Sequence, residues 1–98
     1  MAVGDVYSGL QSVASGATLD IRPAGTMEVV IHDIYYEYDK VELQWTDGVN
    51  TLSSLCAIKG GFMGGCTFHC TNSLWLRIKN IHPTEAKLIG YDGIVTHV

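Results

Sequence analysis

The residue types best suited to chemistry in this sequence are three cysteines and a nearby histidine. Cys56, Cys66, His69 and Cys70 are the donor types of a Cys₃His zinc site. On an extended strand, however, Cys66 and Cys70 lie on one face with His69 on the other, and the two cysteines stand roughly 13 Å apart. That separation also excludes a disulfide between them. We therefore predict reduced thiols that pack as small apolar groups, with no metal ion and no cofactor.

The ionisable residues show no arrangement that suggests catalysis. None of the four histidines falls beside a serine or cysteine in a nucleophile motif; they are His32, His69, His82 and His97. Asp33 and Glu37 are four residues apart on one strand face, too far apart for the carboxylate pair of a retaining glycosidase. The sequence therefore predicts a protein that is not an enzyme.

A glycine-rich segment over residues 60–65 contains two large apolar side chains, Phe62 and Met63. It shares only its glycines with a phosphate-binding loop, because no Gly-Lys-Ser/Thr sequence and no helix follow it. We expect a loop with an apolar tip. If the tip is exposed, it is a contact point for a partner; if it folds inward, it plugs one end of the domain.

Aromatic residues give the strongest indication of a binding surface. Three tyrosines occur within residues 35–38, and Trp75 falls on the polar side of another strand-like segment. Tyr and Trp are favoured at interfaces because a rigid ring buries much area at low entropic cost. The alternative is a rim of core residues with their hydroxyls in water. The predicted interface residues are Tyr35, Tyr36, Tyr38, Phe62, Met63 and Trp75.

The elements that must position these residues are strands, because β-branched and aromatic residues come in short runs between Gly, Asn, Asp and Pro. The clearest strand covers residues 41–46, where apolar and polar side chains alternate. Asp47-Gly48 follows and suits a two-residue type I′ turn. Such a turn pairs Thr46 with Val49.

A second hairpin is predicted near the C-terminus, where residues 86–91 and 94–98 flank Asp92-Gly93. A two-residue turn there pairs Tyr91 with Ile94. Between the hairpins, a strand over residues 74–81 places Trp75 on its outward face together with two cations.

The remaining apolar runs complete an all-β chain of about eight strands. Residues 27–38 are apolar on both strand faces, which is typical of a central or covered strand, and residues 18–22 and 67–70 form shorter strands. We predict a single antiparallel two-sheet β-sandwich over residues 17–98, with a jelly roll as one candidate topology. Residues 1–16 form an N-terminal arm or an edge strand.

Composition narrows the function classes. Charged residues make up 16% of the 98 residues, well below the usual quarter, so part of the surface is expected to be covered by other chains. The net charge is −4 and the six basic residues are scattered, which argues against nucleic-acid binding. No signal peptide or membrane-spanning stretch is recognisable, so we expect a product made in the cytoplasm with no membrane partner.

Two segments near the C-terminus resemble small β-sandwich virion proteins of tailed bacteriophages. They are residues 71–80 (TNSLWLRIKN) and 89–96 (IGYDGIVT), with a looser match over residues 31–35 (IHDIY). Proteins of that family decorate or cement the capsid lattice and have no catalytic residues. The three cysteines and the glycine-rich loop depart from this pattern.

The resemblance implies a non-enzymatic capsid decoration or cement protein, located in the virion. It is expected to form a homo-oligomer, a dimer or a trimer, and to bind the major capsid protein. The alternative is a carbohydrate-binding or receptor-binding module, in which exposed Trp75 and Tyr36 stack on sugar rings.

Overall fold

The computed structural model describes residues 1–98 except 38–39, 58–60 and 65–66, and only the backbone of residues 54–57 and 61–63. The described residues form nine strands and no helix. In chain order the strands are β1 (Val6–Val13), β2 (Thr18–Ile21), β3 (Glu28–Tyr36), β4 (Val41–Thr46), β5 (Thr51–Ala57), β6 (Gly61–Met63), β7 (Phe68–Cys70), β8 (Trp75–Asn80) and β9 (Lys87–His97).

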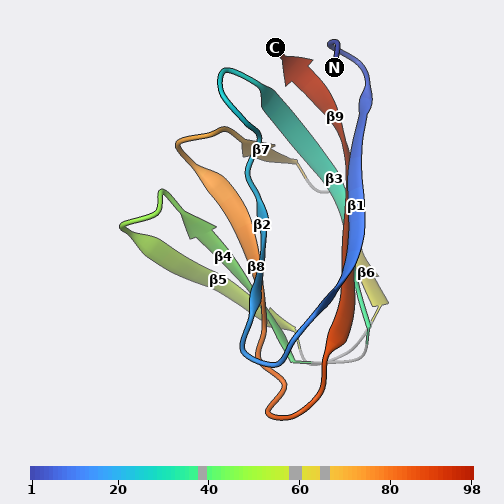
Figure 1. Cartoon of the computed structure of the whole chain (residues 1–98), viewed down its shortest axis with the longest axis vertical. Helices are drawn as coiled ribbons and strands as arrows, with labels where there is room; N and C mark the ends of the chain where they lie inside the picture. Colours follow the sequence, from blue (N-terminus) through green and yellow to red (C-terminus); the bar gives the residue numbers. More distant parts are fainter. Residues whose placement is uncertain (38–39, 58–60, 65–66) are drawn as a thin grey trace.

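The strands form two antiparallel sheets that face each other (Figure 1). One sheet has the order β1-β9-β3-β6, with β7 also paired to β3, and the other has the order β2-β8-β4-β5. β7 pairs with residues 29–31 of β3 and β6 with residues 34–36, so these short strands share one edge position. Each sheet therefore has four strand positions, and the predicted β-sandwich is confirmed.

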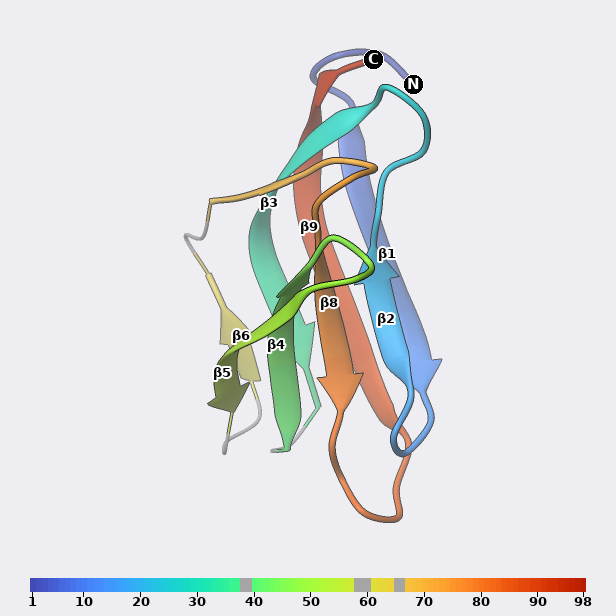
Figure 2. The same cartoon turned by 90° about the vertical axis from the view of Figure 1, so that its left-hand side faces the viewer.

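The strand order also settles the topology. The first strand lies beside the last in one sheet (β1 beside β9), and the second lies beside the next to last in the other (β2 beside β8). This nested pairing of early with late strands is the arrangement of a jelly roll. Figure 2, turned by 90°, shows the β2-β8-β4-β5 layer in front of β1, β9 and β3.

The β4–β5 hairpin is present, but the predicted two-residue turn is wrong. Thr46 pairs with Thr51, so the loop contains four residues. The Asp47 carboxylate accepts hydrogen bonds from the backbone N–H groups of Val49 (2.9 Å) and Asn50 (2.6 Å), which close the longer loop. These bonds hold the pKa of Asp47 below its usual value, and the bond from Asn50 has the largest effect.

The second predicted hairpin is also wrong. Asp92-Gly93 lies inside β9, which runs unbroken from Lys87 to His97. The register between β3 and β9 shifts at this point, between Ile31 and Asp33, so the glycine marks a bulge. A Cβ on Gly93 would overlap the Val30 carbonyl oxygen, and the close approach of two backbones explains why a glycine is there.

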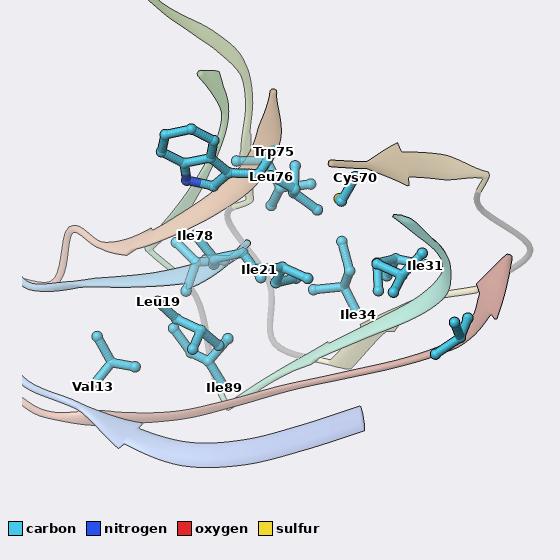
Figure 3. Close-up of a cluster of buried hydrophobic side chains, with 14 residues drawn as sticks. Val13, Leu19, Ile21, Ile31, Ile34, Cys70, Trp75, Leu76, Ile78 and Ile89 are labelled. Atoms are coloured by element: carbon cyan, nitrogen blue, oxygen red, sulfur yellow. The ribbon is translucent and has the colours of Figure 1, made fainter. Parts of the chain in front are cut away.

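Apart from Trp75, which lies on the other side of β8, the core lies between the sheets and is built from inward-facing residues of β1, β2, β3, β4, β7, β8 and β9 (Figure 3). β3 contributes Val29, Ile31 and Ile34, all fully buried. It is a central strand, as its apolar pattern indicates, but its other face is exposed at His32 and Tyr35. The core residues are Val13, Leu19, Ile21, Val29, Ile31, Ile34, Val41, Leu43, Cys70, Trp75, Leu76, Ile78, Ile89 and Val95.

Residues 6–13 of the N-terminal segment form the edge strand β1. Gly4, with φ of 91°, and Asp5 lie opposite Val95: Gly4 N–H donates to the Val95 carbonyl (2.8 Å), and Val95 N–H donates to the Asp5 carbonyl (2.9 Å). This is the pattern of a glycine bulge at the start of a strand. The two chain ends therefore lie side by side at one end of the sandwich (Figure 1).

Candidate interaction surface

The outer face of the β1-β9-β3 sheet is rich in exposed apolar side chains. Because side chains alternate along a strand, the side chains of Val6, Leu10, Leu88, Ile94 and Tyr35 point away from the core, whereas their immediate neighbours along each strand point inward. Their exposed fractions range from 38% at Ile94 to 71% at Leu10. We call these five residues the apolar outer face.

The strand register arranges this face in rows. Leu10 lies opposite Gly90, and Gly90 lies opposite Tyr35 on the next strand. A Cβ on Gly90 would lie 3.0 Å from the Leu10 Cδ1 atom, so the leucine side chain reaches over the glycine. Val6, Ile94 and Val30 form a second apolar row in the same way.

Acidic residues separate and flank the apolar rows. Asp92 lies between Ser8 and Asp33 in the register, and Glu28 pairs with His69, whose Nε2 atom is 2.8 Å from its carboxylate. In the described parts of β1, β3, β7 and β9, the only Lys or Arg is Lys87, which is buried. A partner that offers apolar side chains together with Lys or Arg would complement this face.

Of the predicted interface residues, Tyr35 belongs to this face. Tyr36 points the opposite way and packs, partly buried, against the core. Tyr38 lies outside the described residues, and so do the side chains of Phe62 and Met63, whose backbone in β6 pairs with Tyr35 and Ile34. The two expected positions of the Phe62-Met63 tip therefore stay open.

The prediction of an exposed Trp75 is wrong. Its ring is only 3% exposed, although it lies on the opposite side of β8 from Leu76 and Ile78 (Figure 3). The Arg22 guanidinium covers the ring, with Cζ 4.1 Å from its centroid, and Gly48 of the β4–β5 turn abuts its edge. Trp75 cannot stack on a sugar, which removes one of the two residues behind the carbohydrate-binding alternative.

The residues singled out for chemistry do not form a site in the described structure. Among the described side chains, no three His, Cys, Asp or Glu residues come together as metal ligands. Cys70 is fully buried in the core, and burial raises its pKa to about 11. Cys66 lies outside the described residues, as does the side chain of Cys56.

An apolar cavity of about 350 Å³ lies between the sheets on the side of β7. Trp45, Leu52 and Leu76 line it from one sheet, and Phe68 lines it from the other, with Thr67 and His69 beside them. Apolar walls with one ionisable neighbour suit the packing of an apolar group rather than a reaction.

Sequence reasoning missed four of the five residues in the apolar outer face: Val6, Leu10, Leu88 and Ile94. The available signal was the absence of charge from residues 6–13, where apolar and small side chains occupy both strand faces.

No helix among the described residues has the length and apolar character needed to cross a membrane. Comparison of the chain with protein-family models and with curated proteins finds no match.

Proposed function

We propose that this protein is a non-enzymatic virion component that binds the outside of a capsid as a small homo-oligomer, as a phage decoration or cement protein does. The apolar outer face carries the proposal. Contiguous apolar patches of this kind, bordered by polar groups, mark contact surfaces, whereas single exposed apolar residues do not.

The chemistry of the face supports a protein surface as its partner. Burial of Val6, Leu10 and Ile94 supplies a hydrophobic driving force in proportion to the apolar area removed from water. The carboxylates of Asp33 and Asp92 would then require Lys or Arg across the interface, which favours one orientation and rejects acidic partners. The proposed partner is the major capsid protein, through a basic and apolar region of its outer surface.

The fold adds weaker support. Jelly rolls occur in viral capsid domains and also in lectins, so the topology is compatible with the proposal without selecting it. The resemblance of residues 71–80 and 89–96 to phage decoration proteins supports the same function.

The test is co-sedimentation of the purified protein with heads of the encoding phage that lack it. Ile94→Ser removes an apolar side chain from the middle of its row and leaves net charge unchanged. We expect this variant to bind the heads at least about tenfold more weakly than the wild type.

Leu74→Ser is the matched control. Leu74 is 40% exposed, close to the 38% of Ile94, but it lies directly before β8, a strand of the other sheet. We expect Leu74→Ser to bind heads like the wild type. Equal binding by the two variants, or no binding by the wild type, would overturn the proposal.

A further inference from the structure

Strand β1 is an unusual sheet edge. Its sequence, VYSGLQSV, contains no charged residue and no proline, and its register with β9 continues without a shift from Val6 to Val13. Soluble proteins usually protect such edges with lysine, proline, bulges or short length, because an open edge pairs with other chains. β1 has none of these protections within its eight residues.

The other edges in the described part of the chain are protected. β2 has four residues, and its Asp20 is held by Arg77 through a 2.7 Å hydrogen bond. β5 has a register shift against β4, between Leu43 and Gln44. β6 and β7 have three residues each. Among the described edge strands, β1 is therefore the one best suited to pair with another chain.

The hydrogen-bonding pattern identifies the backbone groups at the open edge. Val95 N–H donates to the Asp5 carbonyl, and antiparallel pairs alternate between hydrogen-bonded and non-hydrogen-bonded positions. Tyr7, Gly9 and Gln11 therefore bond to β9. The residues that direct their N–H and C=O groups away from the sheet are Val6, Ser8, Leu10 and Ser12.

The sequence of β1 is self-complementary. When two copies are paired antiparallel with Gly9 opposite Gly9, Ser8 faces Leu10 and Tyr7 faces Gln11, each in both directions. Val6 then faces Ser12, so each large aliphatic side chain meets a small one. Because no charge lies on the strand, a two-fold axis brings no like charges together.

We propose that two copies of this chain pair through β1, antiparallel, around a two-fold axis next to Gly9. The pairing forms up to about eight backbone hydrogen bonds from groups that β9 does not use. It joins the β1-β9-β3 sheets of the two copies into one continuous sheet and places the apolar outer faces of both copies on the same side. The occupant of the edge is a second copy, because the strand matches its own sequence in length, side-chain size and charge.

This inference rests on the proposed assembly of the chain with itself, and its test uses free protein in solution. It can therefore fail while capsid binding stands, and capsid binding can fail while the dimer forms. Amide hydrogen exchange is followed by NMR at two protein concentrations, one that gives monomer and one that gives dimer by light scattering.

The expected result is an alternating pattern. In the dimer, the amides of Ser8, Leu10 and Ser12 should exchange at least about tenfold more slowly than in the monomer. The amides of Tyr7, Gly9 and Gln11 should change little, because β9 already protects them. Slower exchange without this alternation indicates a dimer formed through the outer face instead, and it would overturn the proposal.

A pair of variants provides a second readout. Ser8→Pro removes an N–H group that no intrachain bond uses, whereas Ser8→Ala keeps that group. Ser8→Pro should be monomeric at concentrations that dimerise the wild type and Ser8→Ala, with the far-ultraviolet circular dichroism of all three alike. A dimeric Ser8→Pro contradicts the proposal, and if this variant does not fold, the exchange pattern decides alone.

Discussion

Asn80 shows how one buried polar residue connects three parts of the chain. Its side-chain amide donates to the Val13 carbonyl (2.9 Å) and the Glu85 carbonyl (2.8 Å), and its Oδ1 atom accepts from His82 N–H (2.9 Å). The residue is fully buried at the end of β8, and its bond to Val13 is shielded from water, whereas those to Glu85 and His82 are partly buried. Asn80 therefore joins the end of β1 to the β8–β9 connection.

Replacement of Asn80 by alanine should be among the most destabilising polar substitutions. It removes three hydrogen bonds and deprives of these partners the buried Val13 carbonyl and two partly buried groups, the Glu85 carbonyl and the His82 amide. We expect the free energy of unfolding to fall by about 3 to 4 kcal/mol, measured by urea denaturation.

Asn72→Ala is the control for this prediction. Asn72 donates a single side-chain bond, to the Pro23 carbonyl (3.0 Å), and it is only partly buried. Its replacement should cost about 1 kcal/mol. Similar losses for the two variants would show that Asn80 does not have the connecting role described above.

Trp75 shows the limit of sequence interpretation for a single residue. Alternation correctly indicates which side of β8 the ring occupies, but it carries no information about what covers that side. The cover comes from Arg22, 53 positions earlier, which is held over the ring by a bond from its Nε to the Asn72 carbonyl (2.8 Å). A contact between residues so distant in sequence leaves no local pattern.

At the scale of elements, the dipeptide Asp-Gly adopts two different structures in this chain, a turn and an extended strand. Asp47-Gly48 lies in a turn, where Gly48 has φ of 94°. Asp92-Gly93 lies within an extended strand, between neighbours on both sides. The local sequence favours a turn at both places. At the second place, pairing of residues 87–97 with both β1 and β3 outweighs the turn preference.

Gly93→Ala tests the steric account of the bulge. A methyl group at this position would meet the Val30 carbonyl oxygen and the Ile31 Cα atom, both in the backbone of β3. Because backbone atoms cannot move aside independently, β3 and β9 must separate. We expect a loss of more than about 3 kcal/mol in the free energy of unfolding, or failure to fold.

Gly16→Ala isolates the effect of backbone conformation. Gly16 has φ of 79°, but no atom lies within 4 Å of a Cβ at that position. We expect this variant to fold, with a loss of about 1 to 2 kcal/mol. If Gly93→Ala is as stable as Gly16→Ala in thermal and urea unfolding, β3 and β9 do not approach as closely as described.

The positions of the strands in the sequence were more predictable than the pairing between strands. The pattern of residues 41–46 and 18–22 identifies β4 and β2 almost to the residue, because each has one apolar and one polar face. The Thr46 register was wrong because side-chain bonds from Asp47 lengthen the loop. Pairing of β1 with β9 could not be predicted, since neither strand encodes the identity of a partner about 80 residues away.

At the scale of the whole molecule, burial of ionisable groups makes stability depend on alkaline pH. Burial raises the pKa of Cys70 from 9.0 to about 11, and it also raises the pKa values of Tyr7 and Tyr91, whose rings lie 5.8 Å apart. These groups ionise more readily in the unfolded chain. The contribution of Cys70 is therefore complete below about pH 9 and is lost as pH rises toward about 11, whereas that of Tyr7 and Tyr91 is lost only as pH rises above 10.0.

The expected slope for Cys70 alone is a loss of about 1.4 kcal/mol in the free energy of unfolding per pH unit between about pH 9 and about pH 11. Urea denaturation across this range measures it. Cys70→Ala should show a shallower slope, with the remaining dependence due mainly to Tyr7 and Tyr91. Parallel curves for the two proteins would contradict the assignment to Cys70.

The candidate surface was less predictable than the fold. Tyr35 was identified because exposed aromatic residues are common at interfaces, yet its row is completed by Leu10, from the other end of the chain. A surface assembled from the first, third and last strands of a jelly roll exists only once the sheet has formed. The sequence shows the members separately and gives no sign that they share a face.

The position of β9 has a consequence for biosynthesis. β9 follows the other described strands in the sequence and so leaves the ribosome after them, yet it lies between β1 and β3 and bonds to both. Until it emerges, those two strands lack the neighbour that completes their sheet. The nascent chain must therefore keep the uncharged strand β1 and the largely apolar strand β3 from aggregating until β9 emerges, and the sheet then closes around β9.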